Sequence, residues 1–317
     1  MKLNHFIALC VLCCLAAGAL PMYGCKHEIT DSPTAEQRFD DSIVVGGITR
    51  SFIVYQPANI QPGEKVPVVF MFHGAGGNGD KFYTNSGWKE KAVTEKFYAV
   101  FPTALTYCIA DTNGVTSTDT HWTSYEFGKN ICPGQTIQND VLFVRDMVTY
   151  IQNHYRADDK RFYIAGFSNG AQFVFRLTIE ASDLFAAASL FAAPLLTPDK
   201  TPQQLIPVYQ GVGNRDRVFL TGLHRTEPFP MDTTLLNIPL FKANMKNACV
   251  TYRLRNKYQF SMQTGYSTFA YTTPADNNHN VFYSNLFKGL DHQYPNGSNY
   301  PLSAPDLVWD FFKQYSK

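Results

Sequence analysis

A serine, an aspartate and a histidine occur in this chain in an order that suits nucleophilic catalysis. Ser168 occupies the middle of a G-x-S-x-G pattern at residues 166–170, and Asp216 and His292 follow it in the chain. A serine hydroxyl becomes a nucleophile when a histidine takes its proton and a carboxylate orients that histidine. The three residues therefore predict attack on a carbonyl carbon, a reaction that needs no cofactor.

The surroundings of Ser168 predict a sharp turn from a strand to a helix. The short apolar run at 162–165 indicates a buried strand, and residues 171–177 have the pattern of a helix. Glycines two residues before and two residues after the serine let the strand and the helix approach closely, while the hydroxyl projects above the sheet. This context makes the pattern more specific than its five residues alone.

Asp216 is the predicted orienting acid. It lies in a loop that leaves the C-terminal end of a strand-like segment at 206–211. An aspartate in such a place is often only a turn or helix cap. Asp291 is its nearest rival, but it lies in the same loop as the histidine rather than at a separate strand end.

His292 is the predicted base. It follows the strand-like run at 280–287, as a base at the end of the order Ser, Asp, His should. His279 lies within an Asn-rich polar stretch, and His224 falls before the last predicted strand. His292 is therefore the best candidate among the late histidines.

An apolar run and then a glycine-rich loop occupy residues 66–79. The run predicts a buried parallel strand, and the loop predicts backbone N–H groups, at Gly74 and Ala75, that bind an oxyanion together with the N–H of Asn169. A phosphate-binding loop is the alternative, but neither a Lys-Ser/Thr pair nor G-x-G-x-x-G is present. His73 is expected to be structural, because the base is expected late in the chain.

With these residues in view, the chain resembles the polyhydroxybutyrate depolymerase and feruloyl esterase group of secreted α/β-hydrolases, which is related to carbohydrate esterase family one. The matching segments are residues 50–57, 73–74, 87–88, 97–102, 139–145, 166–170, 213–216 and 289–295. The resemblance implies an α/β-hydrolase fold, with a mostly parallel central sheet and helices on both faces. It also implies that Ser168, Asp216 and His292 form the triad.

Two departures from the family pattern bear on substrate preference. Tyr294 stands where the family often has tryptophan, and the segment 221–244 is longer than the usual connection. The segment 110–138 is polar and without clear periodicity, which predicts a long loop over the active-site face. Aromatic side chains on these segments, namely Tyr125, Phe127 and Phe229, are candidates to line a narrow cleft.

The chain is expected to hold one catalytic domain, at residues 42–317, in which candidate strands alternate with helical patterns. Residues 139–155 predict an amphipathic helix, and a capping pattern at 303–306 predicts the start of the last one. A chain of this length can bury a hydrophobic core large enough for a single α/β domain.

The N-terminus predicts export. The apolar run at 6–20 is too short to span a bilayer and suits a signal peptide at 1–24. Residues 22–25 resemble a lipoprotein box, so Cys25 is the candidate for lipidation and for the mature N-terminus, with ordinary cleavage nearby as the alternative. Residues 25–41 would then form a flexible tether. The expected location is the cell envelope, or otherwise the periplasm or the medium, with membrane contact only through the lipid.

The remaining cysteines and the charge set further limits. Cys108, Cys132 and Cys249 are disulfide candidates, and Cys108 with Cys132 is the simplest pair, although Cys249 could replace either. No Cys/His cluster has metal-ligand spacing, so no metal site is predicted. A formal charge of +1 without a basic stretch argues against a nucleic-acid partner.

The sequence therefore predicts a serine esterase that acts on ester decorations, feruloyl or acetyl, of plant polysaccharides. A polyhydroxyalkanoate depolymerase is the alternative among esterases. A non-catalytic glycan-binding protein of hydrolase fold and a peptidase are further alternatives from other classes.

Overall fold

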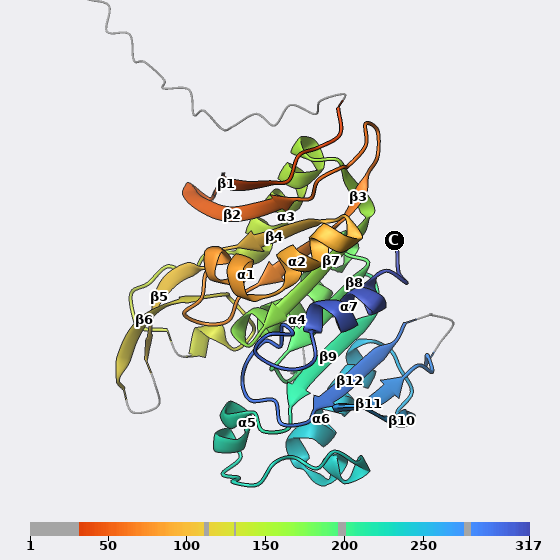
Figure 1. The fold of residues 1–317 in the computed structure, drawn as a ribbon. Coiled ribbons are helices and arrows are strands. Elements are labelled where there is room, and N and C mark those ends of the chain that lie inside the picture. The colour runs from red at the N-terminus through yellow and green to blue at the C-terminus, as the bar shows by residue number, and fades with distance from the viewer. Residues whose placement is uncertain (1–31, 111–113, 130, 196–200, 276–279) are drawn as a thin grey trace, which may run out of the picture.

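The computed structural model describes residues 32–110, 114–129, 131–195, 201–275 and 280–317. Its centre is a ten-stranded sheet in the order β1-β2-β4-β3-β7-β8-β9-β12-β11-β10 (Figure 1). The strands are β1 (Gln37–Val45), β2 (Ile48–Gln56), β3 (Val66–Phe72), β4 (Tyr98–Pro102), β7 (Ala157–Phe167), β8 (Ala187–Phe191), β9 (Val208–Gly213), β10 (Gln259–Gln263), β11 (Tyr266–Tyr271) and β12 (Phe282–Phe287).

The middle of the sheet is parallel, from β4 through β3, β7, β8 and β9 to β12, and antiparallel strands complete both edges. One face packs against α3 (Asp140–His154), α4 (Asn169–Glu180) and α6 (Pro239–Thr251), and the other against α1 (Gly79–Asn85), α2 (Trp88–Glu95) and α7 (Ala304–Phe312). This arrangement confirms the predicted mostly parallel sheet with helices on both faces.

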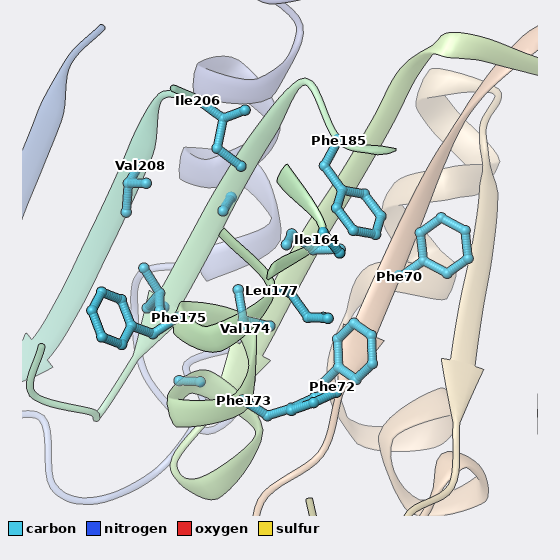
Figure 2. Close-up of a cluster of buried hydrophobic side chains, with 14 of the residues drawn as sticks. Phe70, Phe72, Ile164, Phe173, Val174, Phe175, Leu177, Phe185, Ile206 and Val208 are labelled. Carbon is cyan, nitrogen blue, oxygen red and sulfur yellow. The ribbon is translucent and has the colours of Figure 1, made fainter. Parts of the chain in front are cut away.

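Apolar residues along the central strands explain why these strands lie in the middle of the sheet. Every residue of β3 is buried, as expected for a strand covered by helices on both faces. Figure 2 shows Phe70 and Phe72 of β3 beside Phe173 of α4, and the rings of Phe72 and Phe173 lie 5.5 Å apart. The helix that follows Ser168 is thereby fixed against the strand that leads to the glycine-rich loop.

The first strand corrects a predicted boundary. The tether was expected to run to residue 41, but β1 begins at Gln37 and pairs with β2 along its whole length. The backbone of Thr34 also exchanges hydrogen bonds with Asn59 and Ile60. This edge strand is mostly exposed or half-buried, so its polar sequence resembles that of a tether. The predicted signal peptide and Cys25 lie outside the described residues.

The segment 110–138 also differs from the expected irregular loop. Strands β5 (Leu105–Ala110) and β6 (Thr116–His121) form an antiparallel hairpin apart from the main sheet. The sequence of β6 is polar and none of its residues is buried, which hides the strand from a search for hydrophobic alternation. A long connection at the active-site side is thus present, but it contains β6 and a 3-10 turn at Phe127–Lys129.

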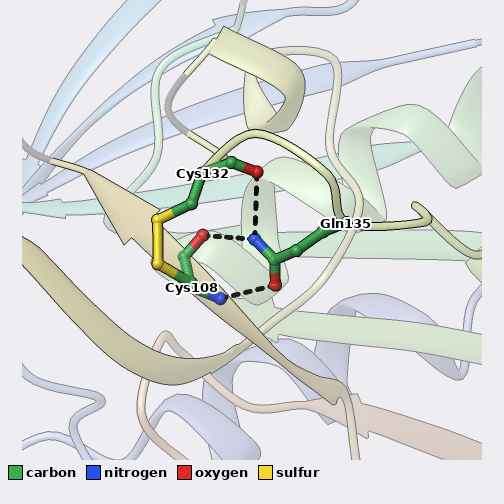
Figure 3. The surroundings of a disulfide bond; sticks show 3 residues. All are labelled: Cys108, Cys132 and Gln135. Atoms are coloured by element: carbon green, nitrogen blue, oxygen red, sulfur yellow. Dashed lines mark hydrogen bonds between the residues drawn. A yellow bond between two sulfur atoms is a disulfide. The ribbon is translucent and has the colours of Figure 1, made fainter.

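A disulfide joins this hairpin to the chain that follows it. Cys108 pairs with Cys132, and Cys249 is a buried free thiol, which confirms the simplest predicted pairing. Gln135 reinforces the link, since its side chain accepts from the Cys108 N–H and donates to the carbonyls of Cys108 and Cys132 (Figure 3).

The segment 221–244 is also partly regular. It holds the end of α5 (Arg217–Gly222), a 3-10 turn (Thr233–Asn237) and the start of α6.

Two helix predictions are confirmed: Asn139 caps α3, and the Ser303 hydroxyl caps α7 by accepting from Asp306 N–H. Within the described ranges, no helix has both the length and the apolarity that crossing a bilayer requires.

Candidate active site

The topology gathers three polar side chains at one edge of the sheet. Ser168 follows β7, Asp216 follows β9 and His292 follows β12, all strands of the parallel region. The carboxyl ends of parallel strands meet at the same edge, which is where open α/β sheets bind their ligands. Residues 124 positions apart in the chain are therefore brought within reach of one another.

Ser168 occupies a strained turn between β7 and α4. Its φ is 53°, in the left-handed region that side chains other than glycine rarely adopt. The flanking glycines are required by close backbone contacts: a Cβ at Gly166 would lie 2.5 Å from the Gly170 carbonyl oxygen, and one at Gly170 would lie 2.3 Å from that of Phe72. This is the predicted turn, and it directs the hydroxyl away from the sheet.

The histidine lies between the serine and the acid. His292 Nε2 is 3.0 Å from Ser168 Oγ, and His292 Nδ1 is 2.8 Å from Asp216 Oδ2. Asp216 is fully buried, and its Oδ1 accepts the N–H groups of Val218 and Phe219 at 3.0 and 3.2 Å. The carboxylate is thus fixed as the N-cap of α5 while its other oxygen faces the imidazole.

Asp291 has a different role from Asp216. Its Oδ2 pairs with Arg217 Nη1 at 2.8 Å, and its Oδ1 accepts the backbone N–H groups of Arg217 and His292. Burial raises the pKa of this carboxyl, but these N–H groups and the guanidinium outweigh it and lower the pKa below the ordinary value. Asp291 therefore ties the histidine loop to the start of α5, a contact that the sequence analysis did not predict.

The first residue of α4 and the glycine-rich loop both lie beside Ser168. Asn169 is the first residue of α4, so its N–H has no partner within the helix and lies at the positive end of the helix dipole. Gly74 lies on the other side, where an added Cβ would be only 3.3 Å from Ser168 Cβ. The loop that contains Gly74 and Ala75 therefore lies directly beside the nucleophile candidate.

A network of buried groups holds these N–H donors in place. The Asn169 side chain accepts from the Trp122 N–H at 2.7 Å and donates to the Trp122 carbonyl at 3.1 Å. The Trp122 indole in turn donates to the His73 carbonyl. Trp122 is a site residue that the sequence analysis missed, because it lies in the polar segment after β6.

His73 supports the glycine-rich loop. Its Nδ1 lies 2.7 Å from the Gly74 carbonyl oxygen, and its Nε2 accepts the Ala104 N–H at 3.0 Å. Accepting at Nε2 requires a neutral ring. Burial lowers the pKa of His73 to about 4, in spite of the opposing carbonyl of Gly74. The predicted structural position of His73 agrees with these contacts.

Comparison with known proteins identifies the class. The family model "Putative esterase" matches residues 47–308. The chain belongs to this esterase family. The resemblance to feruloyl esterases and polyhydroxybutyrate depolymerases found in the sequence is confirmed.

One curated relative, the bifunctional acetylxylan esterase/xylanase XynS20E of Neocallimastix patriciarum, is 24% identical over 172 residues. The match covers 54% of this chain but only 22% of that protein, so the esterase spans about a fifth of its relative's length.

Two solved structures share the fold. The feruloyl esterase module of Clostridium thermocellum, in complex with sinapinate, is 12% identical with a TM-score of 0.53, and the match covers 90% of each chain. The poly(3-hydroxybutyrate) depolymerase LpqC of Bordetella parapertussis is 16% identical with a TM-score of 0.52, over 87% of this chain and 90% of that one. At these identities the likeness shows an α/β-hydrolase fold and nothing more.

The aromatic residues expected to line a cleft have different positions in the esterase. Phe229 is buried against Phe241 at 4.8 Å, so its predicted place in a cleft wall is wrong. Tyr294 is also buried, and its hydroxyl accepts from the Trp88 indole at 2.8 Å, which anchors the histidine loop to α2. Tyr125 packs on Phe175.

A pocket does open beside the first turn of α4. We call it the hairpin pocket; it encloses about 170 Å³ and is lined by Ile109, His121, Ser124, Glu126, Phe127, Asn169 and Gln172. The esterase thus has a cavity adjoining Asn169, one of the residues that flank Ser168. In the part of the chain that the structure describes, no group of three or more His, Cys, Asp or Glu side chains could hold a metal ion.

Proposed function

We propose that the protein is an exported esterase that removes feruloyl or acetyl groups from plant polysaccharides, with Ser168 as nucleophile, His292 as base and Asp216 as orienting acid. One observation carries the catalytic part of this proposal: hydrogen-bond distances of 3.0 and 2.8 Å link Ser168 to His292 and His292 to Asp216. Oxyanion donors come from the N–H of Asn169 and from the Gly74–Ala75 loop.

The reaction has two halves. Ser168 Oγ attacks the ester carbonyl carbon as its proton passes to His292 Nε2, and the oxyanion is held by the N–H groups. The bond to the alcohol then breaks, and His292 gives its proton to the leaving oxygen. Water next loses a proton to His292 and attacks the acyl-serine. The carboxylic acid leaves, and Ser168 takes the proton back.

The substrate part of the proposal is supported by the relatives and by the hairpin pocket. The relatives include proteins named for acetylxylan esterase and feruloyl esterase activities, and both names describe the cleavage of a carboxylic ester. The hairpin pocket adjoins the proposed oxyanion site and offers room for an acyl group. A similar fold is found in a polyhydroxybutyrate depolymerase, so hydroxybutyrate oligomers belong in the test as the competing substrate.

The experiment compares substrates and a nucleophile variant. We expect the purified protein to release ferulate or acetate from esterified xylan fragments faster than it cleaves hydroxybutyrate oligomers. Ser168→Ala should fold normally and lose roughly a thousandfold or more in turnover. A fluorophosphonate should label Ser168 in the parent protein. The opposite substrate ranking would refute the polysaccharide assignment, and near-parental activity of Ser168→Ala would remove Ser168 from the mechanism.

Export is a separate part of the proposal. A signal peptide at 1–24 and lipidation of Cys25 would place the enzyme where polymers too large to import are cut. The disulfide Cys108–Cys132 is consistent with an oxidising compartment. Mass spectrometry of the N-terminal peptide from membranes should find lipid on Cys25, and Cys25→Ser should release the protein from the membrane fraction. An unmodified Cys25 in the mature protein would contradict lipidation.

A further inference from the structure

A buried ion pair outside the triad joins two of the segments that match the family pattern, residues 50–57 and 139–145. Arg50 lies on β2, and Asp140 is the first residue of α3. Arg50 Nη2 is 2.7 Å from Asp140 Oδ1, and the two side chains are only 2% and 0% exposed. Charged side chains are almost never fully buried unless they are paired. Each of these two residues therefore depends on the other for its place in the interior.

The stability of the fold does not by itself account for this pair. Removing two charges from water costs free energy that their attraction often fails to repay, so apolar residues of similar volume are often as stabilising or more so. Asp140 does favour α3, because a carboxylate in the first turn interacts well with the helix dipole. An exposed carboxylate at the same place would do this without a buried partner. The contacts of the pair beyond α3 are the reason to look for another role.

The second carboxylate oxygen of Asp140 holds the backbone next to Trp122. Asp140 Oδ2 accepts the Thr123 N–H at 2.8 Å, and Arg176 Nη1 donates to the Thr123 carbonyl at 2.6 Å. Both backbone groups of Thr123, a buried residue, are thus bound by charged side chains. Hydrogen bonds of this kind are roughly twice as strong as those between neutral groups. The segment 122–123 is therefore fixed from α3 and from α4.

Trp122 connects this fixed segment to the first residue of α4. Both backbone groups of Trp122 bond to the Asn169 side chain, at 2.7 and 3.1 Å. The Trp122 ring also lies within 6° of parallel to the Phe143 ring of α3, with 6.4 Å between the centroids. The Arg50 guanidinium lies over the same Phe143 ring, 4.1 Å from its centroid. The ion pair is thus connected to Asn169 by packing as well as by hydrogen bonds.

We propose that Asp140, held by Arg50, is a positioning residue for the oxyanion site: it sets the orientation of the Asn169 N–H through the backbone of residues 122–123. This inference rests on the proposed function, in which that N–H stabilises the tetrahedral oxyanion. An oxyanion donor is effective only when it is directed at the place where the charge develops. The Asn169 N–H has no partner within α4, so the contacts of its own side chain help to fix it.

An isosteric substitution separates this role from packing. Asp140→Asn keeps the volume of the side chain, but an amide accepts hydrogen bonds through only one of its two terminal atoms. Either the contact with Arg50 or the contact with the Thr123 N–H is then replaced by two donors that face each other. A double variant, Arg50→Met with Asp140→Leu, removes both charges. It should be at least as stable as Asp140→Asn, because no unpaired buried charge remains.

Asp183→Asn is the matched control. Asp183 also pairs with an arginine of α3, Arg145, at 2.8 Å, but its side chain is 41% exposed and it follows the end of α4 that is far from Ser168. Each variant is compared with the parent in kcat and KM on 4-nitrophenyl acetate, in the Kd of phenylboronic acid and in urea unfolding. The boronic acid forms a tetrahedral adduct with a nucleophilic serine, and this adduct resembles the transition state of ester cleavage.

We expect Asp140→Asn to lower kcat by roughly tenfold to a hundredfold, because a misdirected oxyanion donor costs less than a deleted one. Its KM should stay within about twofold of the parent value, while its affinity for phenylboronic acid should fall by a factor similar to that in kcat. The double variant should keep the low kcat even where its unfolding midpoint exceeds that of Asp140→Asn. Asp183→Asn should match the parent in kcat, KM and affinity for the boronic acid.

The outcomes separate this inference from the function on which it rests. A parental kcat in Asp140→Asn, a loss confined to KM, or recovery of kcat together with stability in the double variant would overturn the positioning role and leave the esterase standing. A parent protein that cleaves no carboxylic ester would overturn the proposed function itself.

Discussion

Acidification should destabilise this protein through His73. The folded ring is neutral and fully buried, and its pKa is lowered to about 4, whereas the unfolded chain has an ordinary value of about 6.5. As pH falls below about 6.5 the unfolded chain binds a proton that the folded chain does not, so unfolding becomes more favourable. The loss levels off once pH passes below about 4. Each pH unit is worth about 1.36 kcal/mol, so the free energy of unfolding should fall by about 3.4 kcal/mol between about pH 6.5 and about pH 4.

The assay is urea unfolding of the full-length protein between pH 7.5 and 4, with the free energy of unfolding plotted against pH. Other groups contribute to the slope, so the difference between variants isolates the effect. His73→Asn should be less stable than the parent at pH 7.5, since it loses the contact to Ala104, but the two curves should converge near pH 4. His154→Gln, on the surface of α3, should follow the parent. Parallel curves for the parent and His73→Asn would refute the argument.

Three further predictions follow from single contacts. Asp216→Asn should lower kcat by roughly 10⁴-fold, because an amide facing Nδ1 favours the wrong imidazole tautomer, while Asp291→Asn should stay within about tenfold of the parent; equal losses in both would contradict the assignment of the acid. Gly170→Ala should abolish soluble folding, because its Cβ would lie 2.3 Å from a carbonyl oxygen, whereas Gly222→Ala, with nothing within 4 Å, should be neutral or stabilising in a thermal melt. Replacing Cys108 and Cys132 together by serine should cost roughly 3 kcal/mol in chemical unfolding, and an unchanged midpoint would count against the disulfide.

The parts of the site that follow from local sequence were predictable. The G-x-S-x-G pattern between an apolar run and a helical pattern marks Ser168, because a close strand-to-helix turn needs its glycines. The chain order of the acid and the base then leaves few candidates. Asp216 could be separated from Asp291 because it follows a strand of its own, and the structure does place the two carboxyls in different surroundings.

The features of the site that could not be predicted depend on contacts between segments that are far apart in the sequence. Nothing in the polar stretch around Trp122 indicates that its backbone would hold the Asn169 side chain. The strand β6 was missed for a related reason: it gains no buried face, so no hydrophobic alternation marks it. Phe229 shows the opposite kind of error. It lies on a long connection and was predicted to line a cleft, but its side chain is buried in the core.

These long-range contacts suggest why the site is so heavily supported. The proposed oxyanion donors are backbone N–H groups. A side-chain substitution at Gly74 or Asn169 therefore does not directly change how these N–H groups are oriented. The orientation of these groups depends instead on the contacts that hold each backbone segment. Trp122 holds Asn169, and His73 holds the glycine-rich loop. The Trp122 indole joins the two by donating to the His73 carbonyl. All three links are buried, where a low dielectric strengthens a hydrogen bond, and the His73 ring is the partner among them that can take up a proton. Protonation of His73 should therefore disturb the site as well as the fold, and activity below about pH 5 should fall more steeply in the parent than stability alone requires.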